Sequence, residues 1–96
     1  MAFEWDKAKN ALNIRKHGID FAQACKIFQG PVLTLIDDRE DYGELRETSI
    51  GAVGGSAFIV VVHTDRDGIC RIISARPAQK HERKLYGEAL RKGSLT

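Results

Sequence analysis

Residues 57–76 read AFIVVVHTDRDGICRIISAR, and this stretch decides the fold. Its first seven residues are nearly all apolar and mostly β-branched, a pattern typical of a strand that is buried on both faces. The polar residues 65–68 predict a hairpin turn, after which residues 69–76 form a second strand. Strands joined by a tight turn pair antiparallel, so the stretch predicts the centre of a largely antiparallel sheet.

Two polar residues, His63 and Arg76, end the two strands of this hairpin. A turn of two or four residues places His63 on one face of the sheet with Ser74 and Arg76, whereas a turn of three places it with Arg71. A face that carries His, Ser and Arg suits RNA, because arginine binds phosphate through two parallel hydrogen bonds and histidine transfers protons near neutral pH. The alternative is that both residues have structural roles. In that case His63 is a strand-end residue whose ring is hydrogen-bonded within the protein, and Arg76 pairs with a carboxylate.

The rest of the chain predicts an α+β domain around the hairpin. Asp6 and Asp20 are typical helix N-caps, and Gly18 is a typical helix end. The further strands expected are 3–5, 32–36 and 46–53, and the expected helices are 7–17, 21–28 and 78–90. We therefore expect one domain over residues 1–96, with a largely antiparallel four- to five-stranded sheet, two N-terminal helices, one C-terminal helix and a flexible tail at 91–96.

The last predicted helix carries a charged residue within its apolar stripe. Glu82 lies on the same side of the helical wheel as Leu85 and Tyr86. A buried carboxylate is costly unless it is paired. We therefore expect Glu82 to have an arginine partner from the sheet, either Arg76 or Arg71.

Length and composition limit the functional classes. The chain has 96 residues, of which 43% are hydrophobic, and a net charge of +2. No apolar run approaches the roughly 20 residues needed to cross a membrane, and the N-terminus lacks the pattern of a signal peptide. The two cysteines and three histidines show no metal-ligand spacing, so neither a metal nor another cofactor is expected. Isolated cysteines are typical of a cytoplasmic protein.

Charge is distributed unevenly along the chain. Acidic residues gather within 37–47, and basic residues gather within 7–16 and 76–92. Such segregation allows a nearly neutral chain to bind a polyanion, although an ordinary solvated surface gives the same pattern. His17, which ends the first predicted helix next to Lys16, has two similar explanations: it faces a phosphate, or it interacts with the helix dipole.

An ordered set of short motifs resembles the BrnT family of bacterial ribonuclease toxins. The motifs are Phe3-Glu4-Trp5-Asp6, Asn13 with Lys16-His17-Gly18, Phe21 with Ala24, Gly43-Glu44 with Arg46, Ile50-Gly51, Val61-Val62-His63-Thr64, Arg71-Ile72-Ile73-Ser74-Ala75-Arg76, Glu82-Arg83 and Tyr86. They extend from Phe3 to Glu88, nearly the whole chain. The sequence departs from the family pattern at Leu45 and Glu47, and Glu47 adds negative charge beside Arg46.

The resemblance implies a RelE-like fold and a toxin of a type II toxin–antitoxin module. Such a toxin cleaves RNA without a metal ion and thereby inhibits translation. It is neutralised by a small DNA-binding antitoxin of ribbon-helix-helix type, and a homodimer within the toxin–antitoxin complex is also expected. The alternative is a non-catalytic interaction domain, a degenerate toxin that only binds its antitoxin.

Metal-free RNA cleavage requires groups that transfer protons and cations that hold the phosphate. Together with the resemblance, this requirement selects two sets of residues. The expected catalytic residues are Arg76, His63, His17 and Glu44. The residues expected to bind the substrate are Lys16, Arg46, Arg71, Lys80 and Arg83.

Overall fold

The computed structural model describes residues 1–37, 43–55 and 57–96. In these residues the strands are β1 (Ala2–Trp5), β2 (Leu33–Asp37), β3 (Arg46–Val53), β4 (Ala57–Arg66) and β5 (Ile69–Pro77). The helices are α1 (Lys7–His17), α2 (Phe21–Ala24), the 3-10 helix η1 (Cys25–Gln29) and α3 (Lys80–Lys92). The predicted α+β class is confirmed, and Asp6 and Asp20 cap their helices as expected. No helix in the described part of the chain is long and apolar enough to cross a membrane.

The strands form one mixed sheet in the order β1-β5-β4-β3-β2. The pairings of β2 with β3, β3 with β4 and β4 with β5 are antiparallel, but β1 runs parallel to β5. The prediction of a largely antiparallel sheet is therefore wrong at this edge. The reason is connectivity: β1 leads into α1 rather than into a tight turn, so no hairpin forces it to pair antiparallel.

The second N-terminal helix also differs from the prediction. Instead of one helix over 21–28, α2 forms a single turn and the chain continues as η1. The tighter winding of a 3-10 helix places residues three apart on the same side, and Ala24 and Ile27 are both buried there. Gly51 of β3 permits this close approach, because a Cβ atom at that position would lie 2.8 Å from the Cβ atom of Ile27.

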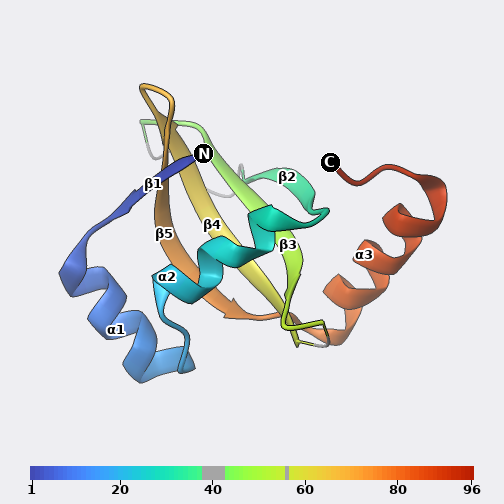
Figure 1. Cartoon of the computed structure of the whole chain (residues 1–96), viewed down its shortest axis with the longest axis horizontal. Helices are drawn as coiled ribbons and strands as arrows, with labels where there is room; N and C mark the ends of the chain where they lie inside the picture. The colour runs from blue at the N-terminus through green and yellow to red at the C-terminus, as the bar shows by residue number, and fades with distance from the viewer. Residues whose placement is uncertain (38–42, 56) are drawn as a thin grey trace.

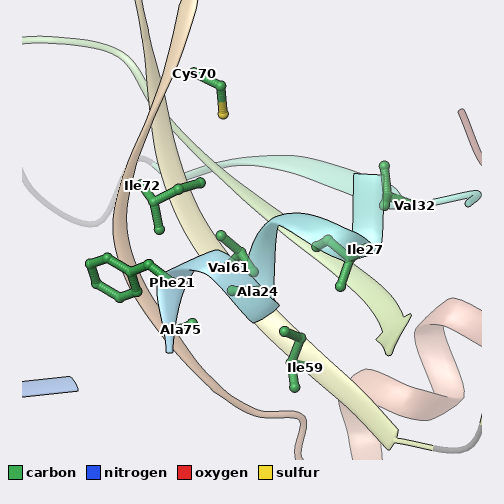
Figure 2. Packing of buried hydrophobic residues seen from close by; sticks show 9 residues of the cluster. All are labelled: Phe21, Ala24, Ile27, Val32, Ile59, Val61, Cys70, Ile72 and Ala75. Atoms are coloured by element: carbon green, nitrogen blue, oxygen red, sulfur yellow. The ribbon is translucent and has the colours of Figure 1, made fainter. Parts of the chain in front are cut away.

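Helices lie on both faces of the sheet (Figure 1). α2 and η1 cover one face, which we call the packed face, and there Phe21, Ile27 and Val61 are at most 1% exposed. Figure 2 shows how the side chains of α2 and η1 meet those of the strands in this cluster. α3 lies on the other face, which we call the open face, where Tyr86 packs against Phe58.

The C-terminal end of the chain folds back onto the domain. α3 begins two residues later than predicted, at Lys80, and the backbone N–H of its N-cap residue Gln79 is bonded to the carboxylate of Glu82. Arg91 and Lys92, which we expected in a flexible tail, belong to the last turn of α3. The backbones of Thr96 and Val32 then exchange two hydrogen bonds of 3.0 Å, so the tail is attached to the segment that precedes β2.

The central hairpin turns at Asp67 and Gly68, whose φ angles of 53° and 83° are both positive. Arg66 pairs with Ile69 on either side of them, so the turn has two residues. Two positive φ angles match the twist of the flanking strands, which is why Asp-Gly is common in such turns. This turn length is one of those for which the sequence predicted a common face for His63 and Arg76.

A β-bulge in β5 nevertheless separates His63 from Arg76. His63 pairs with Ile72, but the preceding residue of β4 pairs with Ser74, so Ile73 is an extra residue without a partner in the register. One extra residue moves every side chain beyond it to the other face of the sheet. His63 and Ile72 therefore lie on the packed face, whereas Ser74 and Arg76 lie on the open face. The predicted common face of His63 and Arg76 is wrong for this reason.

Candidate functional site

α3 covers only part of the open face. At one end of the sheet, Ile50 and Val60 are buried against Ala78 and Tyr86. The next row across this face is Leu35, Thr48, Val62 and Ser74. This row contains no buried residue, so the open face becomes accessible and partly polar beyond α3.

A cleft of about 460 Å³ opens beside this row, lined by residues from the strands, the end of α1 and the first turn of α3. The polar residues that line it are Lys16, His17, Asp37, Thr48, Ser74, Arg76 and Glu82. The structure thus brings together Arg76, His17 and Lys16, which the sequence selected from segments far apart in the chain.

Arg76 is held at the cleft by Glu82, which confirms the predicted pairing of this carboxylate with an arginine. The Nη1 and Nη2 atoms of Arg76 donate to Oε1 and Oε2 of Glu82, each at 2.7 Å. The backbone N–H of Gln79 donates to the same carboxylate at 2.8 Å, within the capping box that begins α3. The orientation of the guanidinium is therefore tied to the first turn of a helix.

The two partners of this ion pair differ in exposure. The side chain of Glu82 is 12% exposed and that of Arg76 is 37% exposed. The hydrogen bonds from Arg76, partly opposed by burial, lower the pKa of Glu82 from 4.5 to about 2, so the carboxylate is ionised at neutral pH. Glu82 thus supports the guanidinium from the protein side, and the more exposed Arg76 presents positive charge to the cleft.

Asn13 places the end of α1 beside the cleft. Its side chain is buried, and its Oδ1 atom accepts a hydrogen bond of 3.1 Å from the backbone N–H of Ala75 in β5. β1 ends before this point, so Asn13 takes the place of a strand partner at the edge of β5. His17 is one helical turn further along α1, on the same side of the helix, and it lines a hollow together with Ser74.

His63 lies on the packed face, away from Arg76. It is 7% exposed, and its Nε2 atom is 2.7 Å from the hydroxyl of Ser49, which is 2.8 Å from the hydroxyl of Thr34. The ring also meets that of Phe28 edge-on, with 5.2 Å between centroids. Burial lowers the pKa of His63, which favours the neutral ring. His63 is therefore a satisfied core histidine, and the expected pairing of its chemistry with Arg76 has no geometric basis.

Glu44 and Arg46 lie together at the start of β3. The Nε atom of Arg46 is 3.6 Å from Oε1 of Glu44. Glu47 pairs in register with His63 and so points to the packed face, whereas the neighbouring Arg46 points to the open face. The negative charge that we expected Glu47 to place beside Arg46 comes instead from Glu44.

The remaining predicted cations do not line the cleft. Arg71 is on the open face but is bonded to Glu4 of β1. Lys80 is exposed in the first turn of α3, and Arg83 donates to a backbone carbonyl at 3.1 Å. Residues 38–42 of the acidic segment lie outside the described residues.

Comparisons with known proteins agree with the motifs found in the sequence. A family model described as ribonuclease toxin, BrnT, of type II toxin–antitoxin system matches residues 5–82. The crystal structure of the Brucella abortus ribonuclease toxin BrnT is similar, with a TM-score of 0.65 and 28% sequence identity over 83% of this chain and 99% of that chain. The curated proteins gave no match. With its fold and most of its length matched in this way, the chain belongs to the BrnT family of ribonuclease toxins of type II toxin–antitoxin systems.

Proposed function

We propose that this chain is a metal-independent endoribonuclease whose active site is the cleft on the open face. The observation that carries the proposal is the convergence of Arg76, Lys16 and His17 on that cleft. Two cations can hold a phosphate and a histidine can move a proton, and these are the requirements of metal-free RNA cleavage.

In the proposed reaction, the 2′-oxygen of a ribose attacks the adjacent phosphorus and forms a new P–O bond, while the bond from phosphorus to the 5′-oxygen breaks. The products are a 2′,3′-cyclic phosphate and a 5′-hydroxyl. One proton leaves the 2′-hydroxyl, and one proton is delivered to the departing 5′-oxygen. We assign one of these transfers to His17, because histidine is the commonest proton-transfer residue in enzymes, and the other to water.

Arg76 has an electrostatic role in this proposal. A guanidinium does not release its proton in the physiological range, so it stabilises the negative charge that builds on the phosphate oxygens. Lys16 supplies a second positive charge on the same cleft. Glu82 is a positioning residue, since its carboxylate binds the guanidinium of Arg76 from the protein side and fixes its orientation.

The substitution Arg76→Lys tests this assignment, because it keeps the positive charge and removes the bidentate hydrogen bonding of the guanidinium. We expect RNA cleavage to fall on the order of 10²-fold, a typical effect of removing one transition-state donor, and the melting temperature to change much less. Glu82→Gln should cause a milder loss of cleavage. Arg91→Lys, in the last turn of α3, is the matched control and should cleave RNA like the wild type.

Three results would contradict the proposal in different ways. Full cleavage by Arg76→Lys would remove Arg76 from the active site. Lost cleavage together with an equally lowered melting temperature would make the ion pair with Glu82 structural. A wild-type chain that binds its antitoxin but cleaves no RNA would be the non-catalytic interaction domain that the sequence also allowed.

We also propose that the chain acts on cytoplasmic RNA and inhibits translation until an antitoxin of ribbon-helix-helix type covers the cleft, in a complex that contains a toxin homodimer. The support is the family, whose members are toxins of type II toxin–antitoxin systems. In the purified complex, amide hydrogen exchange around His17 and Ser74 should be slower than in the toxin alone. Equal exchange rates there would contradict an antitoxin that covers the cleft.

A further inference from the structure

A second cavity lies next to the cleft, at the end of the sheet where the pairing of β4 with β5 stops. In Figure 1 this is the end at which β3 turns into β4 and β5 leads into α3. The cavity has a volume of about 570 Å³, within the usual range for small-molecule sites in proteins. Apolar side chains, among them Ile19, Phe58, Ile59 and Pro77, form most of its lining.

The cavity and the cleft adjoin at three segments of the chain. His17, Arg76 and Glu82 line the cleft, and the residue that follows each of them in the chain lines the cavity. Consecutive Cα atoms are about 3.8 Å apart, so the two hollows share the backbone of three segments. A molecule whose phosphate lies at Arg76 therefore has the cavity within reach of its neighbouring groups.

The walls of the cavity fit a flat ring with polar edges. Phe58 offers an aromatic ring, which is held by an edge-on contact of 5.2 Å with Tyr86, and Pro77 offers a flat apolar surface. The amide of Gln23 and the guanidinium of Arg83 add hydrogen-bonding groups. Proteins recognise single-stranded RNA with this combination, in which bases stack on aromatic or arginine planes and form hydrogen bonds along their edges.

We propose that this cavity binds the nucleobase next to the scissile phosphate and selects the cleavage site by that base. The inference rests on the proposed function, because it takes the phosphate to be bound at Arg76. The three segments that line both hollows support a ligand that spans them, and Arg83 adds positive charge toward a polyanion. A single strand of RNA meets both conditions, with its charged backbone at Arg76 and an uncharged base in the apolar cavity.

Filling the cavity from two different walls tests the proposal. Gln23→Trp introduces an indole from α2 and Ala57→Trp introduces one from β4; both wild-type residues are exposed, so each variant should fold. Ala22→Trp is the matched control, because Ala22 is exposed on the same helix but does not line this cavity. Cleavage positions are then mapped on RNA of random sequence for all four proteins.

We expect the wild type to favour one base beside the cut by about ten-fold, the effect of about one hydrogen bond to the edge of that base. The two filled variants should lose this preference while they still cleave RNA, and Ala22→Trp should keep it. An unchanged preference in both filled variants would overturn the inference and leave the proposed function standing. Loss of antitoxin binding with an intact base preference would also overturn it, in favour of a protein-docking site.

A binding measurement separates this inference from the proposed cleavage. The four ribonucleoside 3′-monophosphates are titrated separately into the isotopically labelled wild type, and the amide signals of Gly18, Phe58 and Ala78 are followed. Shifts at these amides that differ among the four bases would support the cavity even if the chain cleaved no RNA. No shift at these amides with any of the four nucleotides would overturn the inference.

Discussion

Polar residues lie on both faces of the sheet, but their hydrogen-bonding and charged groups find partners in different ways. On the packed face, Thr34, Ser49 and His63 form a chain of hydrogen bonds of 2.8 and 2.7 Å, and Ser49 has no exposed surface. On the open face, Arg76 and Glu82 form an ion pair whose arginine is 37% exposed. A buried, fully bonded network specifies a unique core, whereas a partly exposed ion pair leaves charge within reach of a phosphate.

The backbone, rather than the residue type, determines which of these two roles a side chain takes. The two-residue turn alone would place His63, Ser74 and Arg76 on one face. The extra residue Ile73 instead places Ser74 and Arg76 on the open face, opposite to His63. The comparison therefore depends on a single extra residue in β5, and adding one more residue beyond it is the most direct way to break it.

Inserting one alanine between Ser74 and Ala75 is expected to have the largest effect. The insertion would turn Arg76 toward the packed face, where Glu82 is out of reach of the arginine. Leaving a charge buried without its partner costs about 3–5 kcal/mol, which is comparable with the whole stability of a small domain. We therefore expect the insertion variant to show no cooperative transition in chemical denaturation.

The matched control for this insertion is Ile73→Ala, which preserves the chain length and the bulge. Ile73 is half-buried, so the substitution should cost at most about 2 kcal/mol and the protein should still unfold cooperatively. If the insertion variant unfolded at the same denaturant concentration as the wild type, the number of residues beyond Ile72 would not determine the two faces.

A matched pair of histidine substitutions should sharpen the comparison. His17→Gln should lower RNA cleavage by about 10²- to 10⁴-fold, the usual contribution of a proton-transfer group, with little change in melting temperature. His63→Gln should instead lower the free energy of unfolding by about 1–3 kcal/mol, because it disturbs the buried bond to Ser49. Its folded fraction should still cleave RNA. Lost cleavage at unchanged stability in His63→Gln would return His63 to the active site.

Features that depend on local chemistry could be predicted from the sequence. The N-cap role of Asp6 follows from a short acidic side chain before a helical pattern, and Gly18 ends α1 with a positive φ of 71° as expected. The pairing of Glu82 with Arg76 could also be predicted, since a carboxylate in an apolar stripe needs a cation and few are within reach. Each of these inferences requires only neighbouring residues and one physical rule.

Features that depend on packing from both sides of the sheet could not be predicted in this way. Ile72 and Ile73 are identical in type, so nothing in the sequence marks the second as the bulge. The parallel pairing of β1 joins Glu4 to Arg71, far apart in the chain and joined by no turn signal. Asn13 was assigned no role, because an asparagine on a helix is usually solvated, whereas here it bonds to the edge of β5.

The smallest expected effect concerns the acid stability of the open face. The carboxyl group of Glu82 has a pKa lowered from 4.5 to about 2 by the hydrogen bonds from Arg76, so between these pH values it binds fewer protons in the folded than in the unfolded chain. The stability that it contributes is complete above about pH 4.5 and is lost as the pH falls toward 2.

Glu82→Gln should remove this dependence, because glutamine does not titrate. Over that pH range the wild type should lose on the order of 2 kcal/mol more unfolding free energy than the variant, once the exposure of Arg76 is discounted. Chemical denaturation at a series of pH values measures the difference. Glu88→Gln, further along α3, is the control, since Glu88 forms no ion pair with any described residue. Equal acid losses in wild type and Glu82→Gln would mean that Glu82 does not hold Arg76 in solution, and the guanidinium would then take its orientation from the bound phosphate.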